Sequence, residues 1–294
     1  MDLNIRRLHP YLGGEVTAPL ELRRVHDAAT LAAIRAGMDE YAVLVFREQL
    51  FADEEQMEFA RRLDGELHAK PGSRAVTRSR LGTDAIADIS NVDADGNILE
   101  VDDRRRLYSL GNRLWHTDAS FVDPPGRYSM LSARSLPAGG GPDTQFADMR
   151  AAYDALPEDM KASLQGLEVH HSIAHSRQTL GFEFSAEEAE MIKGAVHPLV
   201  RTLPYGRRSL YVASHASRIL GWTLPEGRLL LRELIEHATQ PQFVFSHKWR
   251  DGDLVIWDNR ATMHRARPFA DTTIRRELRR VTTLDIERPA AAEA

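Results

Sequence analysis

Three side chains in two distant segments are the strongest candidates for chemistry in this chain. The segment Asn112-Arg-Leu-Trp-His116-Thr-Asp118 contains a His-x-Asp motif, and the segment from Gly252 to Phe269 carries His264 after an apolar stretch. Residues two apart in an extended strand face the same side, so His116 and Asp118 can reach one metal ion. Two histidines and one carboxylate on one face of a metal form the facial triad of non-heme Fe(II) oxygenases. His116, Asp118 and His264 are therefore candidates for such a site, although the His-x-Asp motif alone is not specific.

The composition limits which metal sites and partners are possible. The chain has 294 residues, with 12 His, 43 Asp+Glu, 38 Lys+Arg and no Cys. Disulfides, iron–sulfur clusters, thiolate nucleophiles and Cys-ligated zinc are therefore excluded, and a metal must be bound by nitrogen and oxygen. The net charge of −5 gives no general attraction to phosphate backbones, so we expect no nucleic-acid partner. No apolar run is long enough for a membrane span or placed as in a signal peptide, so we expect a cytoplasmic enzyme.

Four arginines follow His264 in the segment Arg275-Arg276-Glu-Leu-Arg279-Arg280. A guanidinium group can bind a carboxylate through two parallel hydrogen bonds, so Arg276 can anchor a dicarboxylate co-substrate. If the segment is extended, Arg276 and Arg280 share one face, while Arg275 and Arg279 share the other. We expect the pair that faces the interior to be functional and the other pair to meet solvent or helices.

The segments that must position these residues change in character near residue 84. Before it, apolar spacing predicts a helix over Asp27 to Glu40, a strand over Val43 to Phe46 and a second helix with its N-cap at Asp53. After it, we expect short strands at Ala85–Asn91, Tyr128–Ala133, Leu167–His171, Leu199–Leu203, Ser209–Ala213, Gln242–Trp249, Asp253–Trp257 and Leu278–Leu284. Helical patterns interrupt the strands at Met149–Leu156 with Pro157–Gln165, at Ala186–Ile192 and at Glu226–His237. Many short strands with a few outer helices indicate a β-sandwich or jelly roll rather than a doubly wound sheet.

No repeat or low-complexity linker divides the chain. We therefore expect a single domain over residues 1–294, with a frayed tail from about residue 289. The sequence has no βαβ alternation and no glycine-rich phosphate loop, which argues against a nucleotide site.

Several longer stretches, together with the His-x-Asp motif, resemble a known family. These stretches are Met38–Phe46, Ala87–Asn91, Leu114–Phe121, Phe146–Leu156, Pro225–Leu231, His237–Pro241 and Trp257–Arg260. Over roughly residues 5–285 the chain resembles the Fe(II)/2-oxoglutarate-dependent dioxygenases of the taurine dioxygenase type, and more closely their 2,4-dichlorophenoxyacetate dioxygenase branch. The resemblance implies a mainly β fold with flanking helices, namely a double-stranded β-helix or cupin-like jelly roll. This expectation agrees with the strand pattern.

The resemblance also implies roles for individual residues. His116, Asp118 and His264 are expected to bind iron, and Thr144 and Arg276 to bind the distal carboxylate of 2-oxoglutarate. The substrate-binding residues are expected to be Arg280, which matches the position that holds the substrate anion, together with Asn112, His68 and Lys70. The sequence adds His215 as a candidate for the substrate pocket, because it follows an expected strand. The glycine-rich loop that ends at Thr144 is one residue longer than the family's usual Gly-Gly-Asp-Thr.

The activity implied is hydroxylation of the carbon next to the ether oxygen of an aryloxyalkanoate such as 2,4-dichlorophenoxyacetate. The products would be a phenol, a 2-oxo acid, succinate and CO2, with Fe(II), 2-oxoglutarate and O2 required and ascorbate as the reductant in vitro. One alternative is a taurine, alkylsulfonate or alkyl sulfate dioxygenase of the same family, since Arg280 would hold either anion. Another is a catalytically inactive, cupin-like binding protein. Members of this type are commonly homo-oligomers, so we expect a dimer or larger.

Overall fold

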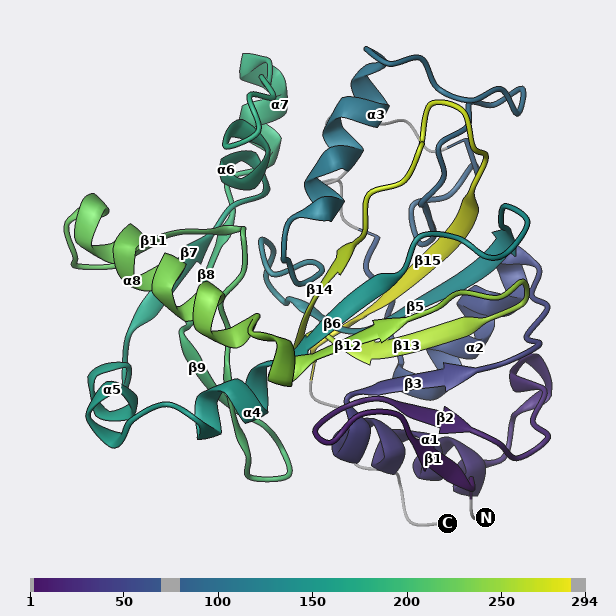
Figure 1. Ribbon diagram of the computed structural model, residues 1–294, viewed down its shortest axis with the longest axis horizontal. Coiled ribbons are helices and arrows are strands. Elements are labelled where there is room, and N and C mark those ends of the chain that lie inside the picture. The colour runs from purple at the N-terminus through teal and green to yellow at the C-terminus, as the bar shows by residue number, and fades with distance from the viewer. Residues whose placement is uncertain (1–2, 70–79, 287–294) are drawn as a thin grey trace.

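The computed structural model describes residues 3–69 and 80–286, and in this part of the chain the largest element is a seven-stranded sheet (Figure 1). Its strands, in order across the sheet, are β1 (Ile5–Arg7), β2 (Gly14–Val16), β3 (Val43–Phe46), β13 (Leu254–Asp258), β5 (Gly126–Ser135), β15 (Glu277–Leu284) and β4 (Ala87–Asp88). Strands β2 and β3 are parallel, and the other neighbours are antiparallel. Segments from both ends of the chain therefore lie in one sheet.

A smaller antiparallel sheet packs against one face of the large sheet. Its strands are β12 (Val244–His247), β6 (Thr144–Asp148) and β14 (Thr262–Ala266). Phe146 of β6 shares a buried core with Val45 of β3 and Trp257 of β13, so this core lies between the two sheets. The neighbouring residues Leu44 and Phe46 point into a second core on the other face of the large sheet. Because side chains alternate along a strand, burial of both faces explains the continuous apolar run of β3.

Two helices cover that second face of the large sheet. Helix α1 (Ala28–Tyr41) starts where the side chain of Asp27 accepts a hydrogen bond from the backbone N–H of Thr30, 2.8 Å away. Helix α2 (Asp53–Asp64) follows β3. Buried residues of both helices contact Leu44 and Phe46 in the second core. The apolar spacing predicted both helices, but the N-cap expected at Asp53 is wrong: Ala52 is the N-cap of α2, and its backbone N–H donates to the carboxylate of Glu55 at 2.8 Å.

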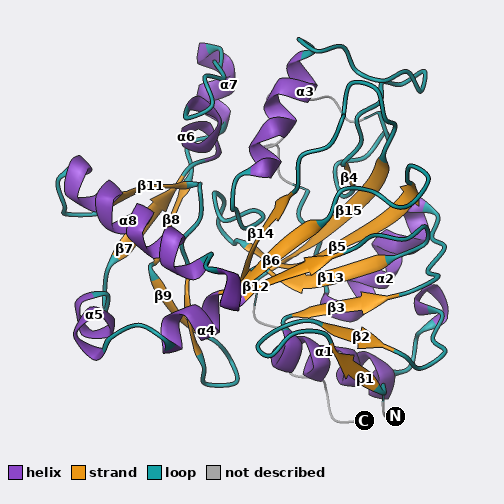
Figure 2. Cartoon of the chain, in the orientation of Figure 1, coloured by secondary structure: helices purple, strands orange, loops and turns teal. Residues whose placement is uncertain are grey.

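The central part of the chain forms a second region, at the left of the large sheet in Figures 1 and 2. Its strands are β7 (Glu168–His171), β8 (Ala195–Pro198), β9 (Val200–Thr202), β10 (Arg208–Leu210) and β11 (Ala216–Ile219). Its helices are α4 (Met149–Asp154), α5 (Glu158–Ser163), α6 (Ile173–Gln178), α7 (Ala186–Met191) and α8 (Leu224–Ala238). The remaining helical segments of the described chain are η1 (Leu22–Arg24), α3 (Arg104–Ser109), η3 (Leu110–Arg113) and η4 (Pro241–Phe243). Helices α4 and α8 share a core with β7, β10 and β11.

The sheet-rich architecture with outer helices agrees with the sequence-based prediction, but several elements differ. The prediction did not include strands β1, β2, β6, β8, β11 and β14 or helices α3 and α6, and the expected strand at Ser209–Ala213 ends at Leu210. Only residues 87–88 of the strand expected at 85–91 are paired as a strand, and the one expected at 242–249 begins with η4. Short helices such as α3 carry too few residues for an apolar period to be visible; Asp103 starts α3 by accepting a hydrogen bond from the backbone N–H of Arg105.

The expected extended conformation of the His-x-Asp motif is also wrong. His116 forms only an isolated bridge with His264 of β14, and Asp118 lies in a turn in which Ala119 has a φ of 55°. The two side chains nevertheless approach each other, with His116 Nε2 3.9 Å from Asp118 Oδ1, and the side-chain Oδ1 of Asn259 accepts a 3.0 Å hydrogen bond from the backbone N–H of Asp118.

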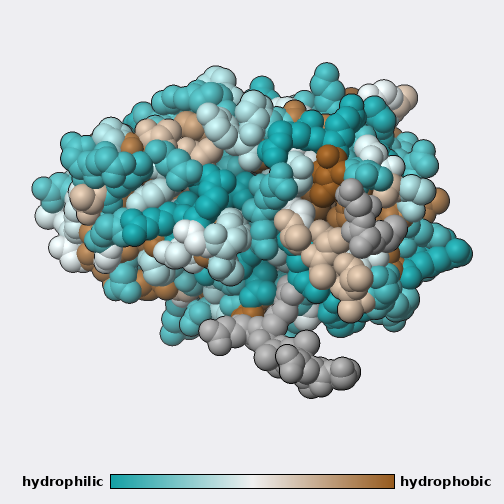
Figure 3. Space-filling view, turned by 90° about the horizontal axis from the view of Figure 1, so that it is seen from below, coloured by the Kyte–Doolittle hydropathy of each residue, from teal (hydrophilic) through white to brown (hydrophobic). Residues whose placement is uncertain are grey.

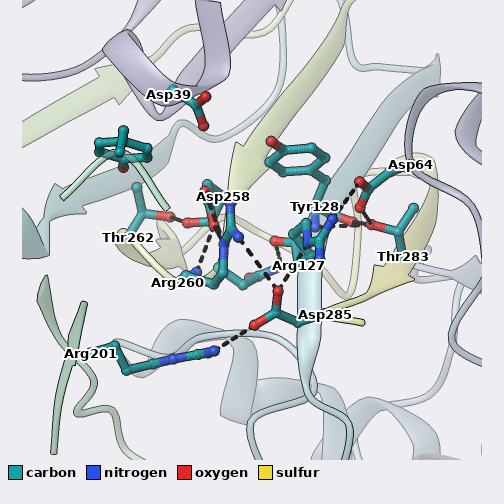
Figure 4. Close-up of polar contacts among 12 residues, drawn as sticks. Asp39, Asp64, Arg127, Tyr128, Arg201, Asp258, Arg260, Thr262, Thr283 and Asp285 are labelled. Atoms are coloured by element: carbon teal, nitrogen blue, oxygen red, sulfur yellow. Dashed lines mark hydrogen bonds and ion pairs between the residues drawn. The ribbon is translucent and has the colours of Figure 1, made fainter. Parts of the chain in front are cut away.

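A buried ion-pair network fixes the turn between β13 and β14 (Figure 4). Arg260 pairs with Asp258 at 2.7 Å and with Asp285 at 3.4 Å, and Asp285 also binds Arg127 at 2.9 Å. Arg201 of the second region reaches the same Asp285 at 2.5 Å. The network therefore ties the end of β15 to the turn that carries Asn259.

Hydrophilic residues cover most of the face seen in Figure 3, and apolar residues occur there in small groups. None of the helices in residues 3–69 and 80–286 has the length and apolar character that a membrane span requires. The tail expected to be frayed, from about residue 289, lies outside the described residues.

Candidate active site

The candidate metal ligands lie beside the core between the large and the small sheet, where His264 contacts Phe146 and Trp257. They are His116, Asp118 and His264. The backbones of His116 and His264 exchange two hydrogen bonds of 3.0 and 2.7 Å, which brings their ring centroids to 4.1 Å. One possible ligand atom from each of the three residues lies within 4.8 Å of the others, and all three residues are buried. This is the only such cluster of His and acidic groups in the described part of the chain. The three residues predicted from the sequence are therefore close enough to bind one metal ion.

The protonation states of the three side chains suit a cation. Nδ1 of His116 lies 2.8 Å from the carbonyl oxygen of Leu114, which can only accept, so Nδ1 carries the proton and Nε2 keeps its lone pair. Burial lowers the pKa of His116 to about 4 and that of His264 well below its usual value. For Asp118, burial is outweighed by the charge of Arg280 and by the two histidines, and its pKa falls to about 2. Two neutral imidazoles and a carboxylate fit Fe(II).

Hydrogen bonds from neighbouring strands orient the carboxylate of Asp118. The hydroxyl of Ser129 on β5 donates to its Oδ2 at 2.7 Å, and the amide of Asn259 donates to that hydroxyl at 3.0 Å. Thr117 is fixed in turn by a 2.7 Å hydrogen bond from its hydroxyl to the carbonyl of Asn259. Sequence reasoning missed Ser129 and Asn259 as site residues, although Asn259 lies in one of the stretches that resembled the family.

Two of the four arginines, Arg275 and Arg276, precede β15, and the other two lie on it. The four divide into the two pairs that the spacing predicts. Arg279 pairs with Asp88 at 2.7 Å, and Arg275 pairs with Glu277. Both arginines therefore have an acidic partner outside the group of His116, Asp118 and His264. Arg276 and Arg280 instead line one cavity next to His116 and His264. The guanidinium of Arg280 also contacts the carboxylate of Asp118.

Arg276 is a buried cation without a counter-charge. Its Nε has no hydrogen-bond partner, no Asp or Glu pairs with it within the described residues, and burial lowers its pKa to about 9, which leaves it charged at neutral pH. Thr144, at the start of β6, lines the same cavity, and its hydroxyl oxygen accepts a 3.0 Å hydrogen bond from the indole of Trp249. The hydroxyl proton is therefore free to donate. A buried unpaired guanidinium beside a hydroxyl donor fits a carboxylate ligand.

The glycine-rich loop leads directly to Thr144, which lines the smaller cavity. Gly140 takes a positive φ of 96°, and a Cβ at this position would lie 2.7 Å from the carbonyl oxygen of Trp249. The loop thus makes a tight turn beside Trp249, and β6 begins at Thr144.

A larger cavity of about 190 Å³ opens on the other side of the cluster. It shares Asn112, His116 and Arg280 with the smaller cavity, and it is also lined by His68 and His215. The wall carries apolar and aromatic side chains from several elements, namely Ile86, Ile89, Val92, Leu99, Tyr108, Phe121 and Ile173. His215 is buried, with Nδ1 3.2 Å from the hydroxyl of Ser120. Lys70, the remaining residue expected in this pocket, lies outside the described residues.

Comparison with known proteins identifies the family. A family model described as "Taurine catabolism dioxygenase TauD, TfdA family" matches residues 4–282. The chain belongs to the TauD/TfdA family. This confirms the resemblance stated from the sequence motifs.

Three relatives of this TauD/TfdA member illustrate the similarity. It is 47% identical, over 97% of this chain and 95% of the relative, to the alpha-ketoglutarate-dependent 2,4-dichlorophenoxyacetate dioxygenase of Burkholderia sp. (strain RASC). It is 37% identical, over 87% and 86%, to the (S)-phenoxypropionate/alpha-ketoglutarate-dioxygenase of Sphingobium herbicidovorans. A crystal structure of AAD-2 in complex with Mn(II) and N-oxalylglycine matches it with a TM-score of 0.92 and 44% identity, over 98% and 99% of the two chains. The chain is thus similar over nearly its whole length to 2-oxoglutarate-dependent dioxygenases.

Proposed function

We propose that this TauD/TfdA family member hydroxylates the carbon next to the ether oxygen of aryloxyalkanoates such as 2,4-dichlorophenoxyacetate. The observation that carries the proposal is the buried His116, Asp118 and His264 cluster, placed between one cavity with an unpaired guanidinium and a second with an apolar wall. The relatives named for phenoxyacetate and phenoxypropionate substrates support the choice of substrate class.

His116, Asp118 and His264 would hold Fe(II), which with O2 and 2-oxoglutarate supplies the oxidising power to replace a C–H bond with C–OH. Arg276 would bind the distal carboxylate of 2-oxoglutarate through its guanidinium, and Thr144 would donate its hydroxyl proton to the same group. Both residues lie away from the larger cavity. The co-substrate would therefore occupy the smaller cavity and leave the larger one to the substrate.

Arg280 would bind the carboxylate of the aryloxyalkanoate at the junction of the two cavities. In an aryloxyacetate the carboxylate and the ether oxygen flank a single carbon, so fixing the carboxylate also fixes the C–H bonds that are to react. The aryl ring would lie against the apolar wall near Phe121 and Ile173. The hydroxylated product is a hemiacetal, which breaks down to a phenol and a 2-oxo acid.

We also propose the finer description of the fold, a double-stranded β-helix forming one catalytic domain. Two observations support it. The two antiparallel sheets face each other across the core that contains Phe146 and Trp257, and the large sheet joins the first strand of the chain to the last. A cytoplasmic location, a homo-oligomeric state and a need for ascorbate in vitro stay predictions.

Sulfonates and sulfate esters are the competing substrates. An alkylsulfatase of Acinetobacter baylyi and an alpha-ketoglutarate-dependent sulfate ester dioxygenase of Pseudomonas putida are each 30% identical to this chain. A tetrahedral sulfonate presents three oxygens, whereas a planar carboxylate presents two, which match the two parallel N–H groups of Arg280.

The test compares kcat/KM for 2,4-dichlorophenoxyacetate, 2-phenoxypropionate, taurine and an alkyl sulfate, with succinate formation measured under Fe(II), 2-oxoglutarate and ascorbate. We expect the phenoxy acids to be preferred and to release phenol. Preferred turnover of taurine or the alkyl sulfate would contradict the proposal. Failure to form succinate with any substrate would favour the inactive binding protein.

A further inference from the structure

Arg177 of α6 is a second buried cation in the wall of the larger cavity, and none of the roles described so far involves it. The residue is 4% exposed, and its Nε has no hydrogen-bond partner. Its terminal nitrogens donate only to neutral oxygens, at 3.1 Å to Ser176 Oγ and at 3.3 Å to Asn112 Oδ1. Within the described residues, no Asp or Glu forms an ion pair with it. A buried charge with neutral partners is costly unless an anion completes the site.

The neighbouring residues leave a fitted space for this guanidinium. Its central carbon lies 4.8 Å from the centre of the Tyr108 ring, on which it stacks. A Cβ at Gly111 would lie only 2.2 Å from the same carbon, so glycine at this position allows the guanidinium to occupy its place. The position of Arg177 is therefore set by α3 and η3, the segment that leads to His116.

Arg177 also fixes the orientation of the Asn112 amide. A guanidinium can only donate, so the group of Asn112 that faces Arg177 must be its carbonyl oxygen. The NH2 group of Asn112 consequently faces away from Arg177. Asn112 lines both cavities beside Arg280. Two cations and one amide donor thus line the same cavity.

The balance of charge in the cavity points to a bound anion. Arg177 and Arg280 line the same cavity, and burial lowers the pKa of Arg177 more than the charges of Tyr108 and Asp118 raise it. Asp118 is the carboxylate that contacts Arg280, and it is also the expected metal ligand. When a metal ion also binds this carboxylate, less of its negative charge is left to balance the positive charges of Arg177 and Arg280.

We infer that Arg177 is a second binding residue for the carboxylate of the substrate, acting together with Arg280 and the amide of Asn112. The inference rests on the proposed function. It assigns the larger cavity to substrates that carry an anionic group next to the reacting carbon, since Arg177, Arg280 and Asn112 all line this cavity.

The test measures KM for 2,4-dichlorophenoxyacetate and KM for 2-oxoglutarate separately in Arg177→Met. We expect the first to rise about 10- to 100-fold, the range for loss of a hydrogen bond to a charged group, and the second to stay within about twofold. The split is expected because Arg177 lines the larger cavity and not the smaller one. Arg177→Lys should recover part of the loss, because it restores the charge without the planar fork.

Gly111→Ala provides an independent variant that keeps every charge. The added methyl group must displace the Arg177 guanidinium, so KM for the phenoxyacetate should rise as in Arg177→Met. The double variant should be no worse than Arg177→Met alone if the methyl group acts through Arg177. The control is Arg113→Met, because Arg113 is nearby but pairs with Asp271 at 3.2 Å; it should leave both KM values within about twofold.

The outcomes separate the inference from the proposed function. If wild-type enzyme turns over the phenoxyacetate but Arg177→Met leaves its KM unchanged, or raises both KM values equally, Arg177 is not a substrate-binding residue. If Arg177→Met does not fold, the same criteria apply to Arg177→Lys and Gly111→Ala. Wild-type enzyme without phenoxyacetate turnover overturns the proposed function and this inference with it.

Discussion

At the scale of single residues, the role of each arginine follows from its partners. Arg276 and Arg279 are both buried and three positions apart, yet Arg279 pairs with Asp88 while Arg276 has no anionic partner in the described chain. The alternation of a strand predicted that Arg276 and Arg280 would share a face, and the family resemblance implied that this face belongs to the site. It could not predict Arg177, because that side chain enters from a short helix with no periodic signal in the sequence.

The two arginines should respond in opposite ways to substitution by methionine. Arg276→Met should raise KM for 2-oxoglutarate about 100-fold or more while leaving the melting temperature unchanged or higher, because it removes an uncompensated buried charge. Arg279→Met should lower the melting temperature, because it removes a buried partner of Asp88. Kinetics and thermal unfolding of both variants check this. A normal KM for 2-oxoglutarate in Arg276→Met would refute the assignment of the smaller cavity.

Asn259 should control metal affinity without touching the metal. Asn259→Ala removes the acceptor of the Asp118 backbone N–H and the donor to Ser129, so the carboxylate loses its fixed orientation. We expect the dissociation constant for Mn(II), measured by calorimetry, to rise about 10- to 100-fold. Asn97→Ala, in an exposed turn, is the control and should not change it. Equal affinities in both variants would argue against the positioning role.

At the scale of elements, apolar patterns predicted the helices and strands that bury an extended apolar face in a core. Helices α1 and α2 and strands β3 and β13 were found because each contributes alternating or periodic residues to a core. Strands β6 and β14 were missed because polar side chains interrupt their apolar residues, among them Thr144 and His264, which serve the site. These two site-bearing strands therefore depart from the patterns that structure alone favours, whereas β5 and β15, which also contribute to the site, follow them.

Gln56 joins α2 to the large sheet and should be a stability determinant. Its side chain is fully buried, donates to the carbonyl of Met130 at 2.9 Å and accepts from Ser132 and Arg134. Gln56→Leu should lower the free energy of unfolding by about 2–4 kcal/mol, because several buried polar groups lose their partner. Urea denaturation measures the change. Glu58→Leu, on the exposed face of the same helix, should change it by less than about 0.5 kcal/mol; similar losses in both would contradict this account.

At the scale of the whole molecule, the candidate metal site brings together parts of the chain that lie far apart in sequence. His116 and Asp118 precede β5, whereas His264 lies on β14. The ion pair between Arg260 and Asp285 connects the end of β15 to the turn between β13 and β14. The family resemblance predicted this juxtaposition. Strand patterns by themselves could not, since they do not determine which strands pair.

A bound metal should therefore stabilise the entire fold. Mn(II) at 100 times its dissociation constant should add about 2.7 kcal/mol to the free energy of unfolding and raise the melting temperature by roughly 5 °C. Chelation should reverse the shift, and His264→Ala should abolish it. A shift of equal size in His264→Ala would place the metal elsewhere.

The measurement that tests the account most directly is the stoichiometry of products from 2,4-dichlorophenoxyacetate. Wild-type enzyme with Fe(II), 2-oxoglutarate and O2 should release one 2,4-dichlorophenol and one glyoxylate for each succinate. His116→Ala should release none of the three. Succinate formed without phenol, or phenol formed equally well by His116→Ala, would contradict the proposal that this cluster cleaves the aryl ether.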